Sequence, residues 1–405
     1  MKGIAFSAPI PTYLATLVAG RLSSAWLVGP HACTRYGEMA TPELPGSRWV
    51  RIRTTLGGIC GSDLGIIALE ASPSTSPFSS FPFVLGHESV GVVDACGATV
   101  SRAGVGDRVT VNPLLCCETR DITPACEACA SGHHSRCAHF TDGALPPGMF
   151  IGTTRGLGGS WGEYFVAHES QLVRVPDGVS DASAVLTEPL ACCVHAVRAT
   201  PPAAGARVLV IGAGTMGLLM VAALRALAPE SRVTVLARHA FQGRHATALG
   251  AARVVLARGD YLTELADAAQ TRLLTPILGR PIGVGGCDAT YVCTSSRRGV
   301  EDAMRFTRAG GSVALLGNVT SLRGLDWTPL WIKELTFRGT LAYGAHAHGE
   351  PDVDAFTEAA ALIASGRAPI AQLVTHQFPI ASYRQALFEA RAKGNGESVK
   401  VAFRF

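Results

Sequence analysis

The pattern of apolar and polar positions changes along the chain and predicts different elements in its two halves. Apolar and polar side chains alternate over residues 49–53, which predicts a strand with one buried face. Residues 208–211 are continuously aliphatic and predict a strand buried on both faces, followed by a helical apolar pattern as far as Leu227. Further runs that predict strands lie at 232–236, 288–294 and 310–317. We therefore expect an α/β fold.

Length and composition narrow the class of protein. A chain of 405 residues is too long for one compact core, so two domains are expected. It is 48% hydrophobic and 16% charged, which fits a well-buried globular protein. The net charge of +4 is mild and no basic run occurs, so we expect no nucleic-acid partner. No convincing signal peptide and no uninterrupted apolar run of ~18 residues is present, so we also expect no membrane association.

A glycine-rich turn links the strand at 208–211 to the helix that follows it. Its glycines are Gly212, Gly214 and Gly217, with Thr215 and Met216 between the last two. Strand, glycine turn and helix in this order form the dinucleotide-binding fingerprint, in which the backbone approaches a pyrophosphate at the helix N-terminus. An ordinary strand–helix turn is the alternative. The long flanking elements favour a nucleotide cofactor.

Donors suited to zinc occur at two places in the first half of the chain. Cys60 lies in a glycine-rich loop, and His87 and Glu88 end a hydrophobic run. Thiolate, imidazole and carboxylate groups are the usual ligands of Zn²⁺. Taken alone, Cys60 is more simply explained as a small buried apolar residue and His87 as a core histidine. Only the sequence around the two residues can favour a metal site.

Twelve cysteines raise the question of disulfides. Five of them cluster as metal ligands do, namely Cys116, Cys117, Cys126, Cys129 and Cys137. A large enzyme-like chain without a signal peptide favours reduced thiols, so we expect a cytoplasmic location. Free thiols are the alternative to a metal site.

The sequence Gly58-Ile59-Cys60-Gly61-Ser62-Asp63, followed by Gly86-His87-Glu88 and then by Val105-Gly106-Asp107-Arg108-Val109, resembles the zinc-dependent medium-chain alcohol and polyol dehydrogenases. The resemblance runs from about Val50 to the end of the chain. It implies a GroES-like, β-rich catalytic domain (1–187 and 343–405) and a Rossmann domain (188–342). It also implies zinc-assisted hydride transfer between a nicotinamide cofactor and an alcohol or carbonyl substrate.

The same resemblance implies the ligands of the catalytic zinc. Cys60 and His87 match two of them, and Glu88 matches a direct or exchangeable ligand of the polyol branch. Glu188, in the sequence Glu188-Pro189-Leu190, matches a further direct or water-mediated contact, although Cys192 and Cys193 lie close by. Ser62 matches the proton-relay hydroxyl and Asp63 an acid that orients the histidine. One departure is Gly65, where the family often has a histidine.

The cysteine cluster matches the structural zinc site of this family, with one change. Family members commonly have Cys-x2-Cys-x2-Cys-x7-Cys, and the first position here is Thr123. We expect Cys117 to complete a site with Cys126, Cys129 and Cys137, with Cys116 in reserve. The rival ligands are His133, His134 and His139, which are more simply read as solvated loop residues.

The second strand of the Rossmann domain bears on the choice of cofactor. NAD-dependent enzymes usually end this strand with an acid, and the matching position here is Ala237, followed by Arg238 and His239. A guanidinium can hold a 2′-phosphate, so we expect NADP(H), with NAD(H) as the alternative. Lys400 matches a basic position that can reach the pyrophosphate in relatives, or it is an ordinary solvated lysine.

Two other functions and the assembly stay open at this point. A zinc lyase or dismutase that retains its nucleotide is one alternative, and a non-catalytic nucleotide-binding sensor is another. The strand expected at 334–340 resembles the family's edge strand, which often pairs across a dimer. We therefore expect a homodimer or a homotetramer acting on a small molecule.

Overall fold

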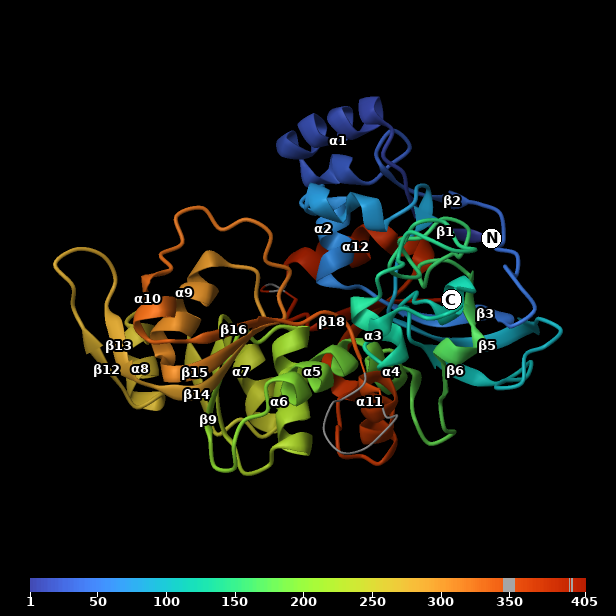
Figure 1. Cartoon of the computed structure of the whole chain (residues 1–405). Helices are drawn as coiled ribbons and strands as arrows, with labels where there is room; N and C mark the ends of the chain where they lie inside the picture. Colours follow the sequence, from blue (N-terminus) through green and yellow to red (C-terminus); the bar gives the residue numbers. More distant parts are fainter. Residues whose placement is uncertain (345–353, 393, 395) are drawn as a thin grey trace. The chain divides into compact units, whose positions relative to one another are not determined.

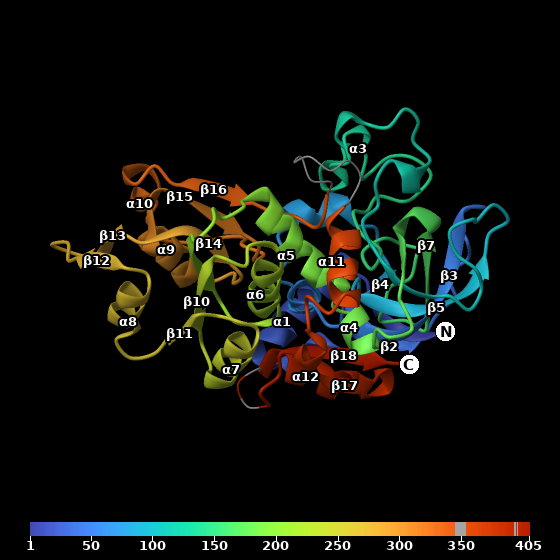
Figure 2. The same cartoon turned by 90° about the horizontal axis from the view of Figure 1, so that it is seen from below.

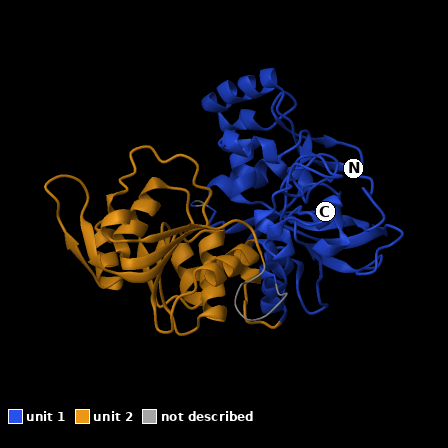
Figure 3. Ribbon diagram, viewed as in Figure 1, with its two compact units in different colours: residues 1–188, 351–364, 374–405 blue, residues 189–350, 365–373 orange. Residues whose placement is uncertain are grey.

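The structure is a computed structural model that describes residues 1–344, 354–392, 394 and 396–405. The chain divides into two compact units (Figure 3). Unit 1 comprises residues 1–188, 351–364 and 374–405, and unit 2 comprises residues 189–350 and 365–373. The domain boundaries expected from the sequence stay a prediction, and part of the expected segment 343–405 lies outside the described residues.

Unit 1 is organised around a seven-stranded sheet with β3 (Trp49–Gly58) near its middle. The strand order is β17 (Val374–Pro379), β18 (Lys400–Arg404), β3, β5 (Ser89–Cys96), β6 (Arg108–Val111) and β8 (Leu172–Arg174). β7 (Tyr164–His168) also pairs with β3. The alternating residues 49–53 therefore lie in a strand, as expected. At the end of this strand, the buried Trp161 donates its indole N–H to the Gly58 carbonyl over 2.8 Å.

A second, three-stranded sheet carries the N-terminal part of unit 1. Its order is β2 (Thr34–Glu38), β1 (Lys2–Phe6) and β4 (Phe83–Val84). Helix α1 (Ile10–Leu22) follows β1, and α2 (Gly61–Ile67) and α12 (Tyr383–Ala392) belong to the same part of the unit (Figure 1). A shared core of Phe6, Phe83, Ile67 and Leu387 holds these elements together.

Unit 2 contains a six-stranded parallel sheet. Its order is β11 (Arg253–Leu256), β10 (Arg232–Ala237), β9 (Arg207–Ile211), β14 (Cys287–Val292), β15 (Thr307–Leu315) and β16 (Thr336–Gly339). The order reverses at β9, as in doubly wound nucleotide-binding folds. The strands expected at 208–211 and 232–236 lie in this sheet, and those expected at 288–294 and 310–317 overlap β14 and β15, which end two residues earlier. The expected edge strand is β16.

Helices cover both faces of this sheet (Figure 2). Leu209 and Ile211 face one apolar core with residues of α8 (Tyr261–Ala268) and α9 (Arg297–Phe306). Val210 faces the other side, toward Gly217 at the start of α6 (Thr215–Leu227). Unit 2 also contains most of α5 (Thr187–Ala199), α7 (Ala240–Ala248), α10 (Thr328–Ile332) and the hairpin of β12 (Thr271–Leu274) and β13 (Ile282–Gly285). Helix α11 (Ala355–Ala364) belongs to unit 1. Among the described residues, no helix has the length and apolar character needed to cross a bilayer.

Candidate functional site

Three potential metal ligands meet in unit 1. Cys60 lies directly before α2, and His87 and Glu88 lie between β4 and β5. One ligand atom from each of these residues lies within 4.8 Å of the others. A thiolate, an imidazole and a carboxylate at this separation form a donor set that fits Zn²⁺.

Asp63 holds two of these three residues in place. Its Oδ2 accepts a hydrogen bond from the Cys60 N–H over 3.0 Å, and its Oδ1 lies 3.3 Å from Nδ1 of His87. Although burial acts in the opposite direction, the charges of Asp63 and Cys60 raise the pKa of His87 well above its usual value. Because Nδ1 faces the carboxylate, Nε2 is the ring atom that can face a metal ion.

The Glu88 carboxylate forms a buried ion pair with Lys400. Both Glu88 oxygens lie 2.6 Å from the ammonium, which also donates to the Ile59 carbonyl over 3.2 Å. Lys400 is only 2% exposed. The expectation that Lys400 reaches the cofactor pyrophosphate is therefore corrected, because its ammonium is buried and already held. Burial lowers the pKa of Lys400, but the charges of Glu88, Cys60 and Glu188 outweigh it and raise that pKa.

The other predicted catalytic residues occupy two helix starts. Ser62 is half-buried in the first turn of α2, two residues after Cys60. Glu188 is buried in the first turn of α5. Glu188 lies outside the three-residue ligand group, but close enough to Lys400 for its charge to raise that lysine's pKa. Neither Cys192 nor Cys193 belongs to the group, and the Cys193 thiol donates to the Met216 carbonyl over 3.4 Å.

Four cysteines converge in the lobe between β6 and β7. The sulfur atoms of Cys117, Cys126, Cys129 and Cys137 all lie within 4.8 Å of one another. Cys116, the reserve candidate, is not in this group, and neither are the three loop histidines His133, His134 and His139. Buried Arg120 supports the lobe, because its guanidinium donates to the carbonyls of Asp142, Leu145, Pro146 and Gly148.

The spacing of these sulfur atoms fits a tetrahedral zinc site. Zn–S bonds of ~2.3 Å place neighbouring sulfur atoms of a tetrahedron roughly 3.7 Å apart. The Sγ atoms of Cys117 and Cys137 are 3.6 Å apart. Against the effect of burial, N–H groups of Ala138 and Cys129 lower the pKa of Cys126 to about 6. Burial raises the pKa of Cys137 to about 11, so crowded thiols of this kind need a cation before all four ionise.

The glycine fingerprint of unit 2 has the geometry of a phosphate-binding turn. Gly212 adopts φ +92°, a left-handed conformation that favours glycine, and Gly214 is the N-cap of α6. A Cβ on Gly217 would overlap the Gly212 carbonyl oxygen, so only glycine lets α6 start this close to β9. Thr215 and Met216 form the first turn of α6, whose free N–H groups attract an anion.

The carboxyl end of β10 carries no acid. Ala237 is buried as its last residue, and Arg238 and His239 follow it, with Arg238 exposed. His239 stacks on Phe241 with ring centroids 5.7 Å apart. Sequence reasoning missed Arg258, which is two residues beyond the end of β11. The parallel register pairs Ala237 with Leu256 and so places Arg238 and Arg258 at neighbouring strand ends.

The parallel sheet with its glycine turn and the two groups of zinc ligands together define the class of protein. They are the features of a zinc-dependent oxidoreductase that uses a nicotinamide cofactor.

Comparisons with known proteins agree. The family descriptions "Alcohol dehydrogenase GroES-like domain" and "Zinc-binding dehydrogenase" match residues 46–177 and 215–365. The protein named Probable D-xylulose reductase A of Arthroderma otae is 29% identical over 91% of this chain and 94% of its own length. A sorbitol dehydrogenase of Arabidopsis thaliana is 28% identical, covering 94% of both chains. A solved Sinorhizobium meliloti protein assigned as a zinc-binding dehydrogenase, with NADP bound, superposes with a TM-score of 0.71 at 25% identity, covering 92% of this chain and 96% of its own.

The chain belongs to the zinc-dependent medium-chain dehydrogenase family, and it is an oxidoreductase of the alcohol dehydrogenase type.

Proposed function

We propose that the protein interconverts a secondary alcohol of a polyol and the corresponding ketone, with NADP(H) as the hydride carrier. The observation that carries this proposal is the group of Cys60, His87 and Glu88 around a point where zinc fits. Bound Zn²⁺ would supply Lewis-acid stabilisation of negative charge on the substrate oxygen. The nicotinamide carries the hydride itself.

The residues of the chain have distinct functions in this proposal. Cys60 and His87 hold the metal, and Asp63 fixes both the Cys60 backbone and the His87 ring. Glu88 and Glu188 are the additional carboxylates, with Glu88 balanced by Lys400. Ser62 accepts the proton released from the substrate hydroxyl and passes it on. The four cysteines Cys117, Cys126, Cys129 and Cys137 hold a second, structural zinc.

The charge of the nucleotide unit supports the preference for NADP(H). Residues 231–259 include five arginines and no Asp or Glu. Among the residues that the structure describes, the side chains of Arg238 and Arg258 have no ion-pair or hydrogen-bond partner. Two unpaired guanidinium groups at adjacent strand ends fit a 2′-phosphate, and the buried methyl of Ala237 offers no carboxylate to repel it. The NADP bound to the similar S. meliloti protein agrees with this assignment.

The proposed substrate class rests on the names of relatives. Sorbitol dehydrogenases, D-xylulose reductases and L-idonate 5-dehydrogenases all act on molecules with several hydroxyl groups, as their names state. The nearby Phe150 ring, with its centroid 6.4 Å from that of His87, provides an apolar wall for the carbon chain of such a substrate.

The experiment is a comparison of initial rates with xylitol, sorbitol and a simple secondary alcohol, each with NADP⁺ and NAD⁺. The proposal predicts faster NADP⁺ reduction with the polyols, and loss of that rate in His87→Ala but not in the matched surface variant His31→Ala. A lyase or dismutase would convert substrate without net formation of NADPH, and a sensor would bind nucleotide without conversion. Either result would contradict the proposal.

A further inference from the structure

Helix α1 exposes four large apolar side chains, and Thr16 is its one buried residue. Four residues spaced four apart point outward and form the surface that we call the α1 face: Ile10, Leu14, Val18 and Leu22, which are 76%, 55%, 62% and 84% exposed. A helix on the surface of a globular protein normally has the opposite arrangement. The face therefore needs a covering partner.

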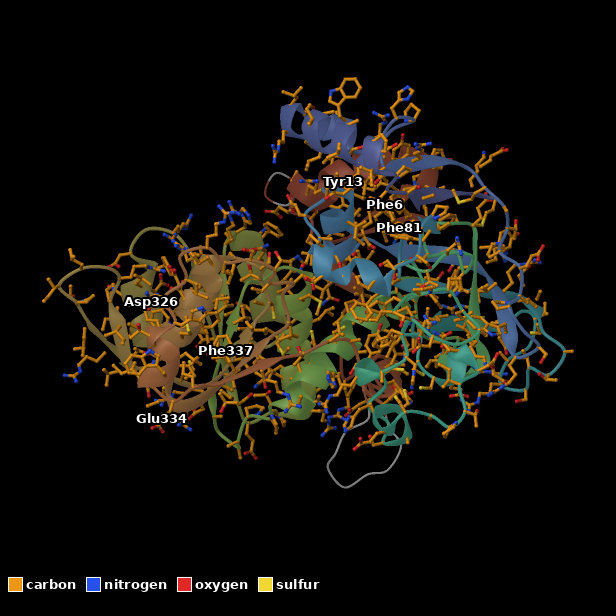
Figure 4. The ribbon with its side chains drawn as sticks, turned by 45° about the horizontal axis from the view of Figure 1, so that its top comes forward. Phe6, Tyr13, Phe81, Asp326, Glu334 and Phe337 are labelled. Atoms are coloured by element: carbon orange, nitrogen blue, oxygen red, sulfur yellow. The ribbon has the colours of Figure 1, made fainter. Side chains whose placement is uncertain are left out.

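The opposite side of α1 attaches the helix firmly to unit 1. Thr16 is buried, and its hydroxyl accepts a hydrogen bond from the Cys33 N–H over 3.1 Å. Gly20 lies directly against the Leu27 side chain, where a Cβ would overlap it. Tyr13 packs on the core that includes Ile67 and lies on the side of α1 toward Phe6 and Phe81 (Figure 4). These contacts fix the orientation of α1 and keep the α1 face on the outside.

The chemistry around the α1 face is that of a protein–protein interface. Trp26, in the short turn η1 (Ser24–Leu27) after α1, is 62% exposed. Arg21 is the only charged residue within α1. The centre of a protein–protein interface is distinguished from the rest of a surface by its few charged residues and by its enrichment in Trp and Arg. The α1 face and its surroundings have this composition.

We propose that the α1 face binds the α1 face of a second copy of this chain across a twofold axis. Its four residues with Trp26 expose on the order of 600 Å², so a symmetric pair would bury on the order of 1,200 Å², which reaches the lower end of the range for specific, stable interfaces. Side chains at i, i+4 and i+8 form a single ridge, and two such ridges pack into each other's grooves at a crossing angle of about −50°.

A second copy fits this surface better than a lipid bilayer does. Helices that lie on membranes combine an apolar face with several Lys or Arg residues beside it. α1 has one arginine, and its other side is buried against the unit rather than facing headgroups. The absence of other charges suits a self-complementary contact, in which every charge on the axis would meet its own copy.

The twofold axis makes a specific prediction for residue 18. The centre of the ridge lies between Leu14 and Val18, so each Val18 lies close to the axis and to its counterpart. Val18→Glu and Val18→Arg should each halve the mass of the assembly, whether the wild type is a dimer or, through additional pairing of the edge strand β16, a tetramer. An equimolar mixture of the two variants should restore the wild-type mass, because opposite charges then meet at the axis.

The measurement is sedimentation velocity on the full chain at fixed concentration, with zinc content and circular dichroism as checks of folding. Val105→Glu is the matched control, because Val105 is a 70% exposed apolar residue of unit 1 on the loop before β6, and it should leave the mass unchanged. A monomeric wild type, an unchanged mass in both Val18 variants, or a mixture that stays dissociated would each overturn the proposal. A flotation assay with phosphatidylglycerol vesicles tests the membrane alternative. If the wild type does not self-associate but floats with the vesicles, and Val18→Glu does not float, the proposal is overturned.

Discussion

Glu88 and Lys400, 312 positions apart in the chain, form an ion pair with both carboxylate oxygens 2.6 Å from the ammonium. Neither side chain has appreciable contact with solvent. The pair joins the loop before β5 to the start of β18 and places a positive charge directly behind a potential zinc ligand. A buried charge without its partner is costly, so each residue depends on the other.

Replacing the lysine tests this dependence. We expect Lys400→Met to lower the free energy of unfolding by ~3–5 kcal/mol, because the Glu88 carboxylate then lies buried without a counter-charge. The double variant Lys400→Met, Glu88→Gln should recover part of this loss, since it removes both charges. Urea denaturation followed by tryptophan fluorescence measures the difference. Equal stabilities of Lys400→Met and the wild type would show that the pair is not maintained in solution.

The second zinc site can be tested with two adjacent cysteines. Cys117→Ser should reduce the zinc content by one ion per chain and destabilise the lobe, because three sulfur ligands remain. Cys116→Ser is the matched control, since Cys116 is buried beside Cys117 but outside the four-sulfur group. Atomic absorption on the two purified variants checks this. Loss of zinc from Cys116→Ser alone would assign the fourth ligand to the wrong cysteine.

The nucleotide preference should respond to the two arginines separately from the catalytic site. Arg238→Ala and Arg258→Ala should each weaken NADPH binding by roughly 10–100-fold, as expected for loss of a charge-assisted contact worth ~1.5–3 kcal/mol. NADH binding should change less than about twofold, because NADH lacks the 2′-phosphate. Ala237→Asp should shift the preference toward NADH. Titrations of nicotinamide fluorescence give the dissociation constants, and equal weakening of both cofactors would exclude a 2′-phosphate contact.

Acid should destabilise unit 1 partly through Glu169. This carboxylate is almost fully buried and accepts hydrogen bonds from the Ser101 and Arg102 N–H groups and from Arg48. The Ser101 and Arg48 contacts lower its pKa to about 2. A lowered pKa means that the stabilisation is complete above the usual glutamate value of ~4.3 and is lost as the pH falls toward 2. The melting temperature of Glu169→Gln should therefore lie below that of the wild type at pH 6, and the difference should shrink by pH 3. A difference independent of pH would contradict the assignment.

Features of the fold and of the site could be predicted from the sequence where the residues that form them are close together in the chain. The fingerprint Gly212–Gly217 and its flanking strand and helix were predictable, because turn, strand and helix are specified by neighbouring residues. Cys117 was expected at its site, although a departure from the family spacing precedes Cys126. The contact of Lys400 with Glu88 was not predictable, because it depends on how β18 pairs with β3.

Two other features, the exposed apolar face of α1 and the position of Arg258, were not predicted from the sequence, for different physical reasons. The apolar residues of α1 follow helical spacing, but the sequence does not reveal which side faces the core, since both sides are largely uncharged. Arg258 was overlooked because its proximity to Arg238 follows only from the parallel register of β10 and β11. Both require the tertiary arrangement to be interpreted.

The central claim is that Cys60, His87 and Glu88 hold a zinc ion that hydride transfer requires. The most direct test is to measure the metal content per chain and the rate of polyol oxidation for the wild type and for Cys60→Ser. The control is Cys96→Ser, because Cys96 is a half-buried thiol on β5. The account predicts about two zinc ions in the wild type and in Cys96→Ser. It predicts about one in Cys60→Ser, which should still bind NADPH but have no measurable turnover. A Cys60→Ser variant that keeps both zinc ions and oxidises polyols at the wild-type rate would contradict the account.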